Sequence, residues 1–206
     1  MTGEGYVKYA AEHTMAAAIE TPLWAKTPHW ALLNSARTKL REMGLIGANS
    51  SGIGFGNLSV RVSGDQFLIS GTATGAAAVL GPDGYCLISS FDIEKNRVVS
   101  TGPVKPSSEA MTHGIVYRSC PEANCVIHIH SRAIFDGMLR DNCPATPETA
   151  AYGTPEIALA IGRCVREAAK NEGSVVLAGH DEGVIVYGPA VERALSLTEE
   201  LYGRYS

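Results

Sequence analysis

The sequence is short of charge, lacks long hydrophobic runs and contains no common nucleotide-binding signature. Only 18% of its 206 residues are charged, and the net charge is −4; an average soluble protein has about 25% charged residues. No run of Lys and Arg is present to bind a phosphate backbone, so we expect no nucleic-acid partner. No apolar stretch approaches the roughly 20 residues of a membrane span, so we expect no membrane partner. Neither GxGxxG nor GxxxxGK[ST] occurs, so no nucleotide-binding fold is indicated.

Disulfides and secretion are equally poorly supported. The five cysteines form no CxxC pair and their number is odd, and a chain of this length buries enough core to fold without disulfides. The N-terminal residues include Glu4 and lack a basic stretch followed by an apolar run, which is unlike a secretory signal. We therefore expect reduced thiols in a cytoplasmic protein.

Hydrophobic periodicity predicts an α/β sandwich with a largely antiparallel sheet, because short hairpin strands alternate with amphipathic helices. Residues 1–27 are predicted to form a short helix and a lead-in, and residues 28–206 a single domain. Predicted helices cover 30–43, 107–119, 155–171 and 189–202. Predicted strands cover 58–62, 66–70, 84–90, 126–130, 175–178 and 183–187, with a further strand or turn at 97–100.

Glycine is abundant where charge is scarce. Ten of the 22 glycines fall between Gly44 and Gly84. The glycine-rich segments 52–57 and 70–75 expose backbone N–H groups, and Ser107-Ser108 leads a predicted helix; such places bind anions, phosphate above all. Flexible surface loops are the alternative interpretation of each segment, and Asn57 either contacts a ligand or only holds its turn.

His128 and His130 form an H-x-H motif inside a predicted strand. Alternate residues of a strand share a face, so both imidazoles point the same way while Ile127 and Ile129 point to the opposite side. Two adjacent imidazoles suit a divalent cation such as Zn²⁺, which binds each nitrogen at about 2.0–2.1 Å. The same alternation argues against Cys125 as a third ligand. By itself the motif is also compatible with ordinary core or surface histidines.

His180 and Glu109 strengthen the interpretation of the motif as a metal site. His180 follows the apolar strand VVLA and Gly179, and three histidines with an open position are typical of catalytic zinc. Glu109 lies at the start of the predicted helix 107–119. Its carboxylate is suited to three roles: capping the helix, binding the metal as a fourth ligand, or acting as a base beside it.

Six motifs together resemble one family. They are GFGNLSVR (54–61), SGTATG (70–75), KPSSEAMTHGIVY (105–117), VIHIHS (126–131), YGTPE (152–156) and AGHDEGVIVYG (178–188). Their identity and order resemble the class II aldolase/adducin N-terminal domain family, whose best-known enzyme is L-fuculose-phosphate aldolase. The resemblance implies an α/β (α+β) three-layer sandwich with a mixed, mainly antiparallel central sheet flanked by helices. It also implies a homotetramer with sites at subunit interfaces.

The resemblance also implies a role for each motif. His128, His130 and His180 fall on the family's zinc-binding histidines, and Glu109 on a ligand of the resting metal that also transfers the proton. Zn²⁺ in such enzymes chelates the carbonyl and hydroxyl oxygens of dihydroxyacetone phosphate and stabilises the ene-diolate. The residues that fall on the phosphate-binding segments are Gly56, Asn57, Gly71, Thr72, Thr74, Gly75, Ser107 and Ser108.

The sequence departs from the family pattern in the SGTATG loop and C-terminal tail and at two places that concern the proposed metal site. The motif after His180 is two residues longer, so that Asp181 and Glu182 are expected to add two carboxylates near the metal. The segment 131–152, which carries a catalytic tyrosine in the aldolase, is shorter here, and Tyr152 is the substitute it offers. Arg132 is expected either to bind an anionic substrate or to form a surface salt bridge.

We therefore expect a zinc-dependent aldolase-type lyase that cleaves a small phosphorylated ketose by retro-aldol chemistry. The first alternative is a family dehydratase of the methylthioribulose-phosphate type. A 4-epimerase is less favoured, because those enzymes tend to have Asp where Glu109 stands. A non-catalytic adducin-like binding module is the remaining alternative, although members of that branch generally lose the histidines.

Overall fold

The computed structural model describes residues 9–15, 24 and 27–206. Its helices are α1 Pro28–Glu42, α2 Ala110–Ser119, α3 Arg132–Arg140, α4 Pro155–Ala168 and α5 Val191–Tyr205. Its strands are β1 Ala10–Met15, β2 Gly47–Ala48, β3 Gly54–Phe55, β4 Asn57–Ser63, β5 Gln66–Ser70, β6 Tyr85–Asp92, β7 Arg97–Gly102, β8 Cys125–His130, β9 Gly173–Val176 and β10 Gly183–Gly188. None of the helices in these residues is long and apolar enough to cross a membrane.

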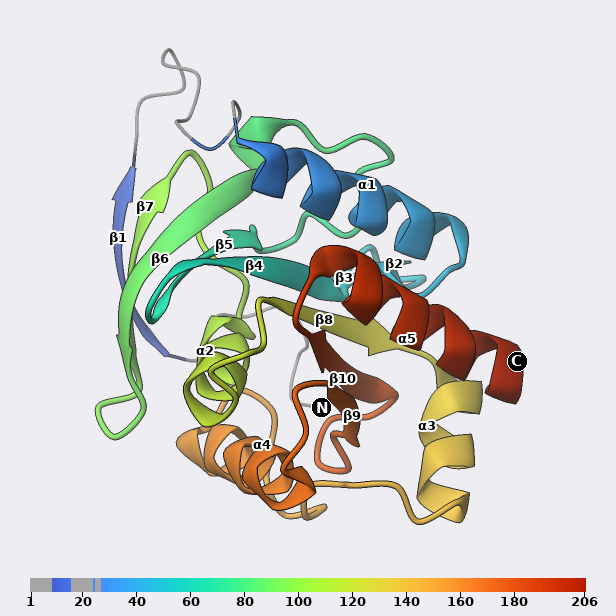
Figure 1. Ribbon diagram of the computed structural model, residues 1–206. Helices are drawn as coiled ribbons and strands as arrows, with labels where there is room; N and C mark the ends of the chain where they lie inside the picture. The colour runs from blue at the N-terminus through green and yellow to red at the C-terminus, as the bar shows by residue number, and fades with distance from the viewer. Residues whose placement is uncertain (1–8, 16–23, 25–26) are drawn as a thin grey trace.

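Eight of these strands form one sheet in the order β1-β7-β6-β5-β4-β8-β10-β9, and β2 pairs with β3 separately. The pairing of β1 with β7 is parallel, whereas the neighbours further along the sheet pair antiparallel. Helices α1 and α5 cover one face of the sheet and α2 and α4 the other, while α3 packs beside α5 (Figure 1). The predicted three-layer sandwich with a mixed, mainly antiparallel sheet is confirmed.

Strand alternation divides the buried side chains into two cores. On β4 and β8, Leu58, Ile127 and Ile129 join the core beneath α1 and α5. Val126, from the opposite face of β8, joins the core shared with α2 and α4. The polar residues of β4 and β8 therefore point toward the layer that contains α2.

Helix α1 forms where the periodicity predicts it, because both of its ends carry local signals. The hydroxyl of Thr27 accepts a hydrogen bond from Trp30 N–H at 3.5 Å at the start. At the end, Gly44 has φ of +75°, a left-handed conformation that glycine adopts without steric cost. The buried side of the helix includes Leu33 and Leu40, each 0% exposed.

The short helix predicted within residues 1–27 does not include Ala10–Met15. These residues form β1, which pairs in parallel with β7 from Ala10 opposite Arg97 to Met15 opposite Gly102. Hydrogen bonds to a neighbouring strand outweigh the helix propensity of an alanine-rich segment, which is only tenths of a kcal/mol per residue. Most of residues 1–27 lie outside the described residues, so the boundary at residue 27 stays a prediction.

Helix α3 was not predicted at all. Its start is marked by Ser131, whose hydroxyl accepts a hydrogen bond from Ile134 N–H at 3.4 Å. Ile134 and Met138, four residues apart, are both 0% exposed and pack into the core beneath α5. The serine cap and this pair are the signals that would have indicated the helix.

All five cysteines are free, as expected, and three of them are buried.

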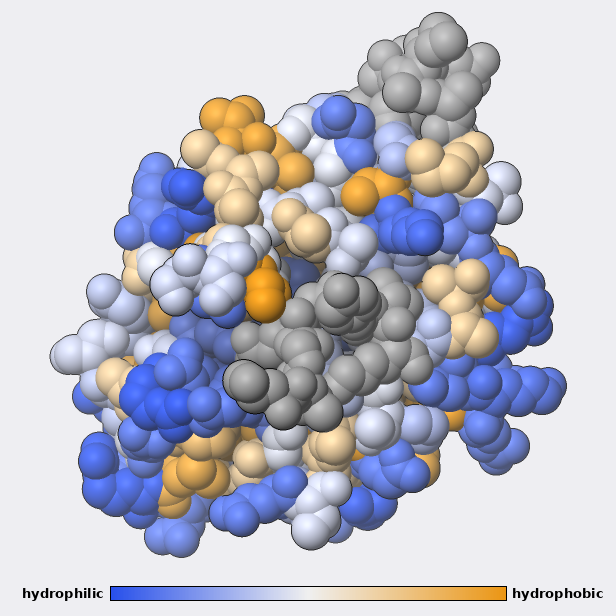
Figure 2. All heavy atoms as spheres, turned by 180° about the vertical axis from the view of Figure 1, so that it is seen from behind, coloured by the Kyte–Doolittle hydropathy of each residue, from blue (hydrophilic) through white to orange (hydrophobic). Residues whose placement is uncertain are grey.

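The surface has hydrophobic residues in small groups. On the face opposite to that of Figure 1, these groups lie between hydrophilic residues (Figure 2). The most exposed large hydrophobic side chains among the described residues are Val79, at 87%, and Met15, at 64%.

Candidate metal and substrate site

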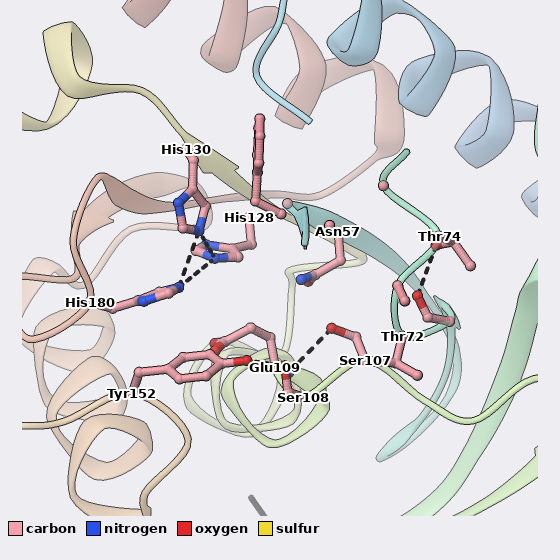
Figure 3. A pocket seen from close by; sticks show the side chains of 16 residues that line it. Asn57, Thr72, Thr74, Ser107, Ser108, Glu109, His128, His130, Tyr152 and His180 are labelled. Atoms are coloured by element: carbon pink, nitrogen blue, oxygen red, sulfur yellow. Dashed lines mark hydrogen bonds between the residues drawn. The ribbon is translucent and has the colours of Figure 1, made fainter. Parts of the chain in front are cut away.

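Three imidazoles meet at one end of a pocket. His128 and His130 project from the same face of β8, and His180 comes from the turn between β9 and β10 (Figure 3). The Nε2 atom of His130 lies 3.1 Å from both His128 Nε2 and His180 Nε2, and the last two atoms are 3.3 Å apart. The antiparallel pairing of β8 with β10 brings His180 to the two histidines of the strand.

This triangle has the dimensions of a metal site. Three nitrogens at about 2.05 Å from a tetrahedral Zn²⁺ lie about 3.3 Å from one another, which matches the observed separations. All three histidines are buried, and together they form a cluster that could hold a metal ion. The residues therefore fit a divalent cation.

The electrostatics of the cluster also suit a cation. Burial, together with the neighbouring His130 and His180, lowers the pKa of His128 well below its usual value, and burial lowers the pKa of His130 to about 4. Both imidazoles are thus neutral at pH 7, the form that binds metals. The Nδ1–H of His128 donates to the carbonyl oxygen of Val184 at 3.3 Å, which leaves the Nε2 lone pair available.

Gly183 creates the space that the histidines occupy. It lies opposite His130 in the sheet. A Cβ atom at this position would lie 2.8 Å from Cδ2 of His180 and 3.1 Å from Cε1 of His128. A larger residue would therefore push these two rings out of position, so the glycine supports the geometry of the triangle.

The carboxylate of Glu109 lines the same pocket and does not cap the helix. Helix α2 begins at Ala110, not at Ser107 as predicted, and Glu109 is its N-cap residue without a side-chain hydrogen bond to the helix. Its side chain is 2% exposed. The ligand atoms that lie within 4.8 Å of one another belong to the three histidines. The role of Glu109 as a ligand, a base or both stays a prediction.

The twelve residues predicted to bind the metal or the phosphate, or to act as the base, all line this one pocket, which contains about 470 Å³ of empty space including the solvent at its mouth. They are Gly56, Asn57, Gly71, Thr72, Thr74, Gly75, Ser107, Ser108, Glu109, His128, His130 and His180. Sequence reasoning did not select Gly54, Phe55 and Ala73, which line it as well. The pocket thus joins the predicted metal ligands to the predicted phosphate loops.

The two halves of the pocket differ in chemistry. Figure 3 shows the histidines at one end, Thr72 and Thr74 at the other, and Asn57 and Glu109 between them. Asn57 lies opposite His128 in the pairing of β4 with β8. Its Oδ1 atom is buried and makes no hydrogen bond to a described residue, so it presents an unused acceptor to whatever enters the pocket.

Tyr152 is a much better-placed residue than the sequence suggested. Its ring stacks on that of His180, with centroids 4.3 Å apart and an interplanar angle of 22°. Its hydroxyl forms a hydrogen bond with the hydroxyl of Ser108. Tyr9 was not selected from the sequence. Its hydroxyl donates to the carbonyl oxygen of Ser107 at 2.8 Å, and burial, followed by the charges of Cys86, Glu109 and Tyr152, raises its pKa.

Asp181 and Glu182, which are expected to add carboxylates near the metal, are not among the clustered metal-binding groups. The charge of Asp181 nevertheless acts on the cluster, because it raises the pKa of His130 against the lowering effect of burial. Arg132 binds both acids, with Nη2 at 2.6 Å from the Asp181 carboxylate and Nε at 3.3 Å from that of Glu182. Their side chains are 72% and 41% exposed. The acids stay at the surface because a charge in water needs no compensation and Arg132 offers a partner there. Arg132 is thus a surface salt-bridge residue.

His113 belongs to a buried polar network behind the pocket. Its Nδ1 atom lies 2.7 Å from the hydroxyl of Ser59, which is also 2.7 Å from the hydroxyl of Tyr117. Burial lowers the pKa of His113 to about 3, so this imidazole is neutral. The network does not line the pocket, so we assign His113 a packing role.

Comparison with known proteins decides the family. The profile of the family Class II Aldolase and Adducin N-terminal domain matches residues 44–203, more than half of the chain. This chain belongs to that family. Family members act on sugar phosphates as lyases, epimerases or decarboxylases, and the family is typically dependent on a divalent metal.

Individual relatives agree with this assignment. The chain is 30% identical over 164 residues to the 3-oxo-tetronate 4-phosphate decarboxylase of Haemophilus influenzae, which covers 72% of this chain and 73% of that protein. The L-fuculose-1-phosphate aldolase of Thermus thermophilus superposes with a TM-score of 0.60 at 23% identity, covering 84% of this chain and 88% of the other. YgbL from Klebsiella pneumoniae gives 0.63 at 21% identity, covering 84% of both chains. These two structures share the fold.

Proposed function

We propose that this class II aldolase family member is a zinc-dependent lyase that cleaves a small phosphorylated ketose by retro-aldol chemistry. The observation that carries the proposal is the triangle of imidazole nitrogens, 3.1–3.3 Å apart, in one pocket with Glu109 and the glycine-rich loops. A divalent cation with nitrogen ligands and an open coordination position is a catalytic arrangement. The finer roles below rest on this placement.

The histidines and the loops would hold opposite ends of the substrate. His128, His130 and His180 would bind Zn²⁺, which supplies Lewis-acid stabilisation for negative charge on the substrate oxygens. The phosphate would lie at the end of the pocket lined by Thr72, Thr74 and the neighbouring glycines, whose backbone N–H groups suit an anion. In this arrangement the carbon–carbon bond would lie beside Glu109.

Glu109 and Tyr152 would move the two protons. When the carbon–carbon bond breaks, its electron pair stays on the carbon next to the ketone, and Glu109 returns a proton to that carbon. The hydroxyl proton lost as the other fragment becomes an aldehyde passes to Tyr152. In the direction of cleavage the reaction would therefore start with Glu109 as the carboxylic acid and Tyr152 as a phenolate hydrogen-bonded to the hydroxyl of Ser108. In the direction of synthesis Glu109 removes the proton from the carbon, and Tyr152 gives its proton to the oxygen of the aldehyde.

Decarboxylation is the second candidate, because the 30% identical relative is a 3-oxo-tetronate 4-phosphate decarboxylase. Loss of CO₂ from a 3-oxo acid also leaves an electron pair on the carbon next to a ketone, and Glu109 would again protonate it. No hydroxyl proton has to leave, so Tyr152 has no chemical part in this reaction. Replacing Tyr152 by Phe should therefore slow an aldol cleavage strongly and a decarboxylation little.

A substrate screen with the zinc-loaded protein tests the proposal. Phosphorylated ketoses that release an aldehyde and a triose phosphate support the aldolase, whereas release of CO₂ from a phosphorylated 3-oxo acid supports the decarboxylase. Cleavage of neither, with a dehydrated product instead, would support the methylthioribulose-phosphate type of dehydratase. The matched controls are His128→Ala, which should lose metal and activity, and Ile127→Ala on the other face of the same strand, which should keep both. Absence of stoichiometric metal in the wild type would sink the enzyme hypothesis and favour an adducin-like binding module.

The proposed function also includes an oligomeric state and a location in the cell. We infer a cytoplasmic homotetramer with sites at subunit interfaces, and membership of the family supports the inference. Light scattering of the purified protein measures the mass of the assembly directly. A monomer that retains full activity would contradict a site shared between subunits.

A further inference from the structure

Arg37 of α1 is a buried cation against the loop predicted to bind phosphate. It is 1% exposed. Its Nη2 atom donates to the carbonyl oxygens of Thr74 at 2.8 Å, Ala77 at 2.6 Å and, at the longer distance of 3.3 Å, Gly75. One guanidinium thus holds three carbonyls of a single loop from the side of the α1 layer.

The charge of Arg37 has no counter-ion in the described part of the chain. None of the ion pairs found there includes Arg37, and its Nη1 atom is buried without a hydrogen-bond partner. A guanidinium does not lose its proton in a protein. A buried cation without a paired anion is strongly unfavourable, so carbonyl contacts compensate it only in part.

The contacts with Arg37 also orient the amides of the loop. In a planar trans peptide the C=O of one residue and the N–H of the next point in opposite directions. With the carbonyls of Thr74 and Gly75 turned toward Arg37, the N–H groups of Gly75 and Ala76 point away from it. Neither N–H donates to another described residue. Ala73, two residues before Gly75, has φ of +58°, the left-handed conformation that also occurs in anion-binding nests.

We propose that Arg37 is a positioning residue for the phosphate of the substrate. It holds the loop by its carbonyls so that the amides are available to the anion, and the phosphate is the counter-ion that the buried guanidinium lacks. The inference rests on the proposed function, because it assumes that the loop of this pocket binds phosphate. It adds a residue of α1 that lies outside the pocket lining and outside the six sequence motifs.

The role of Arg37 is tested in the zinc-loaded protein with inorganic phosphate and with a pair of substrates, a phosphorylated sugar and the same sugar without its phosphate. Arg37→Gln should weaken phosphate binding and raise KM for the phosphorylated substrate by about 10- to 100-fold, since charge-assisted contacts are the strong ones. The kcat, the zinc content and KM for the same sugar without phosphate should change less than about twofold. Arg37→Lys keeps the charge, so it should restore much of the affinity for phosphate; an affinity as low as that of Arg37→Gln would contradict the role of phosphate as the counter-ion.

Arg41, one turn further along α1, is the matched control. Its Nη2 donates to Ala76 O of the same loop at 3.5 Å in an exposed position, so Arg41→Gln should leave phosphate affinity within about twofold of the wild type. The inference would be overturned if Arg37→Gln raised KM equally for the phosphorylated and the unphosphorylated substrate. It would also be overturned if Arg37→Gln and Arg37→Lys left the affinity for phosphate unchanged. Failure of the wild type itself to bind phosphate or to prefer the phosphorylated sugar would instead overturn the phosphate site of the proposed function, and the role of Arg37 with it.

Discussion

Strands β4 and β8 show two faces built from alternating residues of the same segments. Toward α1 and α5, Leu58, Ile127 and Ile129 are all 0% exposed and belong to one hydrophobic cluster. Toward α2, Asn57 and His128 are almost as deeply buried, at 7% and 1%, but they are polar. The first face gains free energy from burial, about 25 cal/mol per Å² of apolar surface, whereas the second requires partners for its polar atoms. Stability and function are thus separated by the two-residue period of a strand.

Among the substitutions that test this difference between the apolar and the polar side of the sheet, the largest effect is expected at Glu109. Glu109→Gln keeps the shape of the side chain and removes its ability to accept a proton, so activity and proton exchange on the substrate should fall by about 10²- to 10⁴-fold. Elemental analysis should find the zinc content unchanged. Loss of the metal together with the activity would show that Glu109 is chiefly a ligand.

A smaller loss is expected when the polar face is disturbed without removal of a ligand. Gly183→Ala places a methyl group against His180 and His128, so the affinity for zinc should fall by about 10- to 100-fold, as when the support of a ligand is lost. Competition with a chromophoric chelator measures the affinity. An unchanged affinity would mean that the rings have room to move and that Gly183 does not define the triangle.

On the apolar face a deletion should change stability alone. Ile127→Ala removes three buried carbon atoms and should lower the free energy of unfolding by about 2–5 kcal/mol, as measured by urea denaturation. Zinc content and kcat, measured well below the unfolding midpoint, should remain those of the wild type. A large loss of metal in this variant would break the proposed separation of the two faces.

The smallest expected effect is a dependence of the free energy of unfolding on pH in the metal-free protein. Burial lowers the pKa of His113 to about 3 and that of His130 to about 4. Below pH 6.5 the unfolded chain therefore binds protons that the folded chain does not, and stability falls as pH drops from 6.5 toward 4. Each histidine adds about 1.4 kcal/mol per pH unit to this slope once its unfolded form is protonated.

Urea denaturation of chelator-treated protein at pH 7, 6 and 5 measures the slope. His113→Gln should reduce it by the contribution of one proton, because this residue is neither a predicted metal ligand nor part of the pocket lining. An identical slope in the wild type and in His113→Gln would show that His113 titrates alike in the folded and unfolded chains.

Sequence reasoning succeeded where one local rule was sufficient. The alternation of a strand places His128 and His130 on one face, and the end of a strand places His180 at an edge. It failed where a distant segment decided the outcome. Ala10–Met15 form strand β1 through their pairing with β7, a segment more than 80 residues further along the chain.

The sequence by itself determined which chemical groups are present and the local element that carries each: the H-x-H strand, the glycine loops and the helix that follows Glu109. Only the tertiary structure decided their distances. His180 is 50 residues from His130, and their nitrogens come within 3.1 Å because β10 pairs with β8. In the same way, Arg37 reaches the 74–77 loop only because α1 packs over the sheet. Local propensities act over a few residues, whereas a site is set by the pairing and packing of segments far apart in the chain.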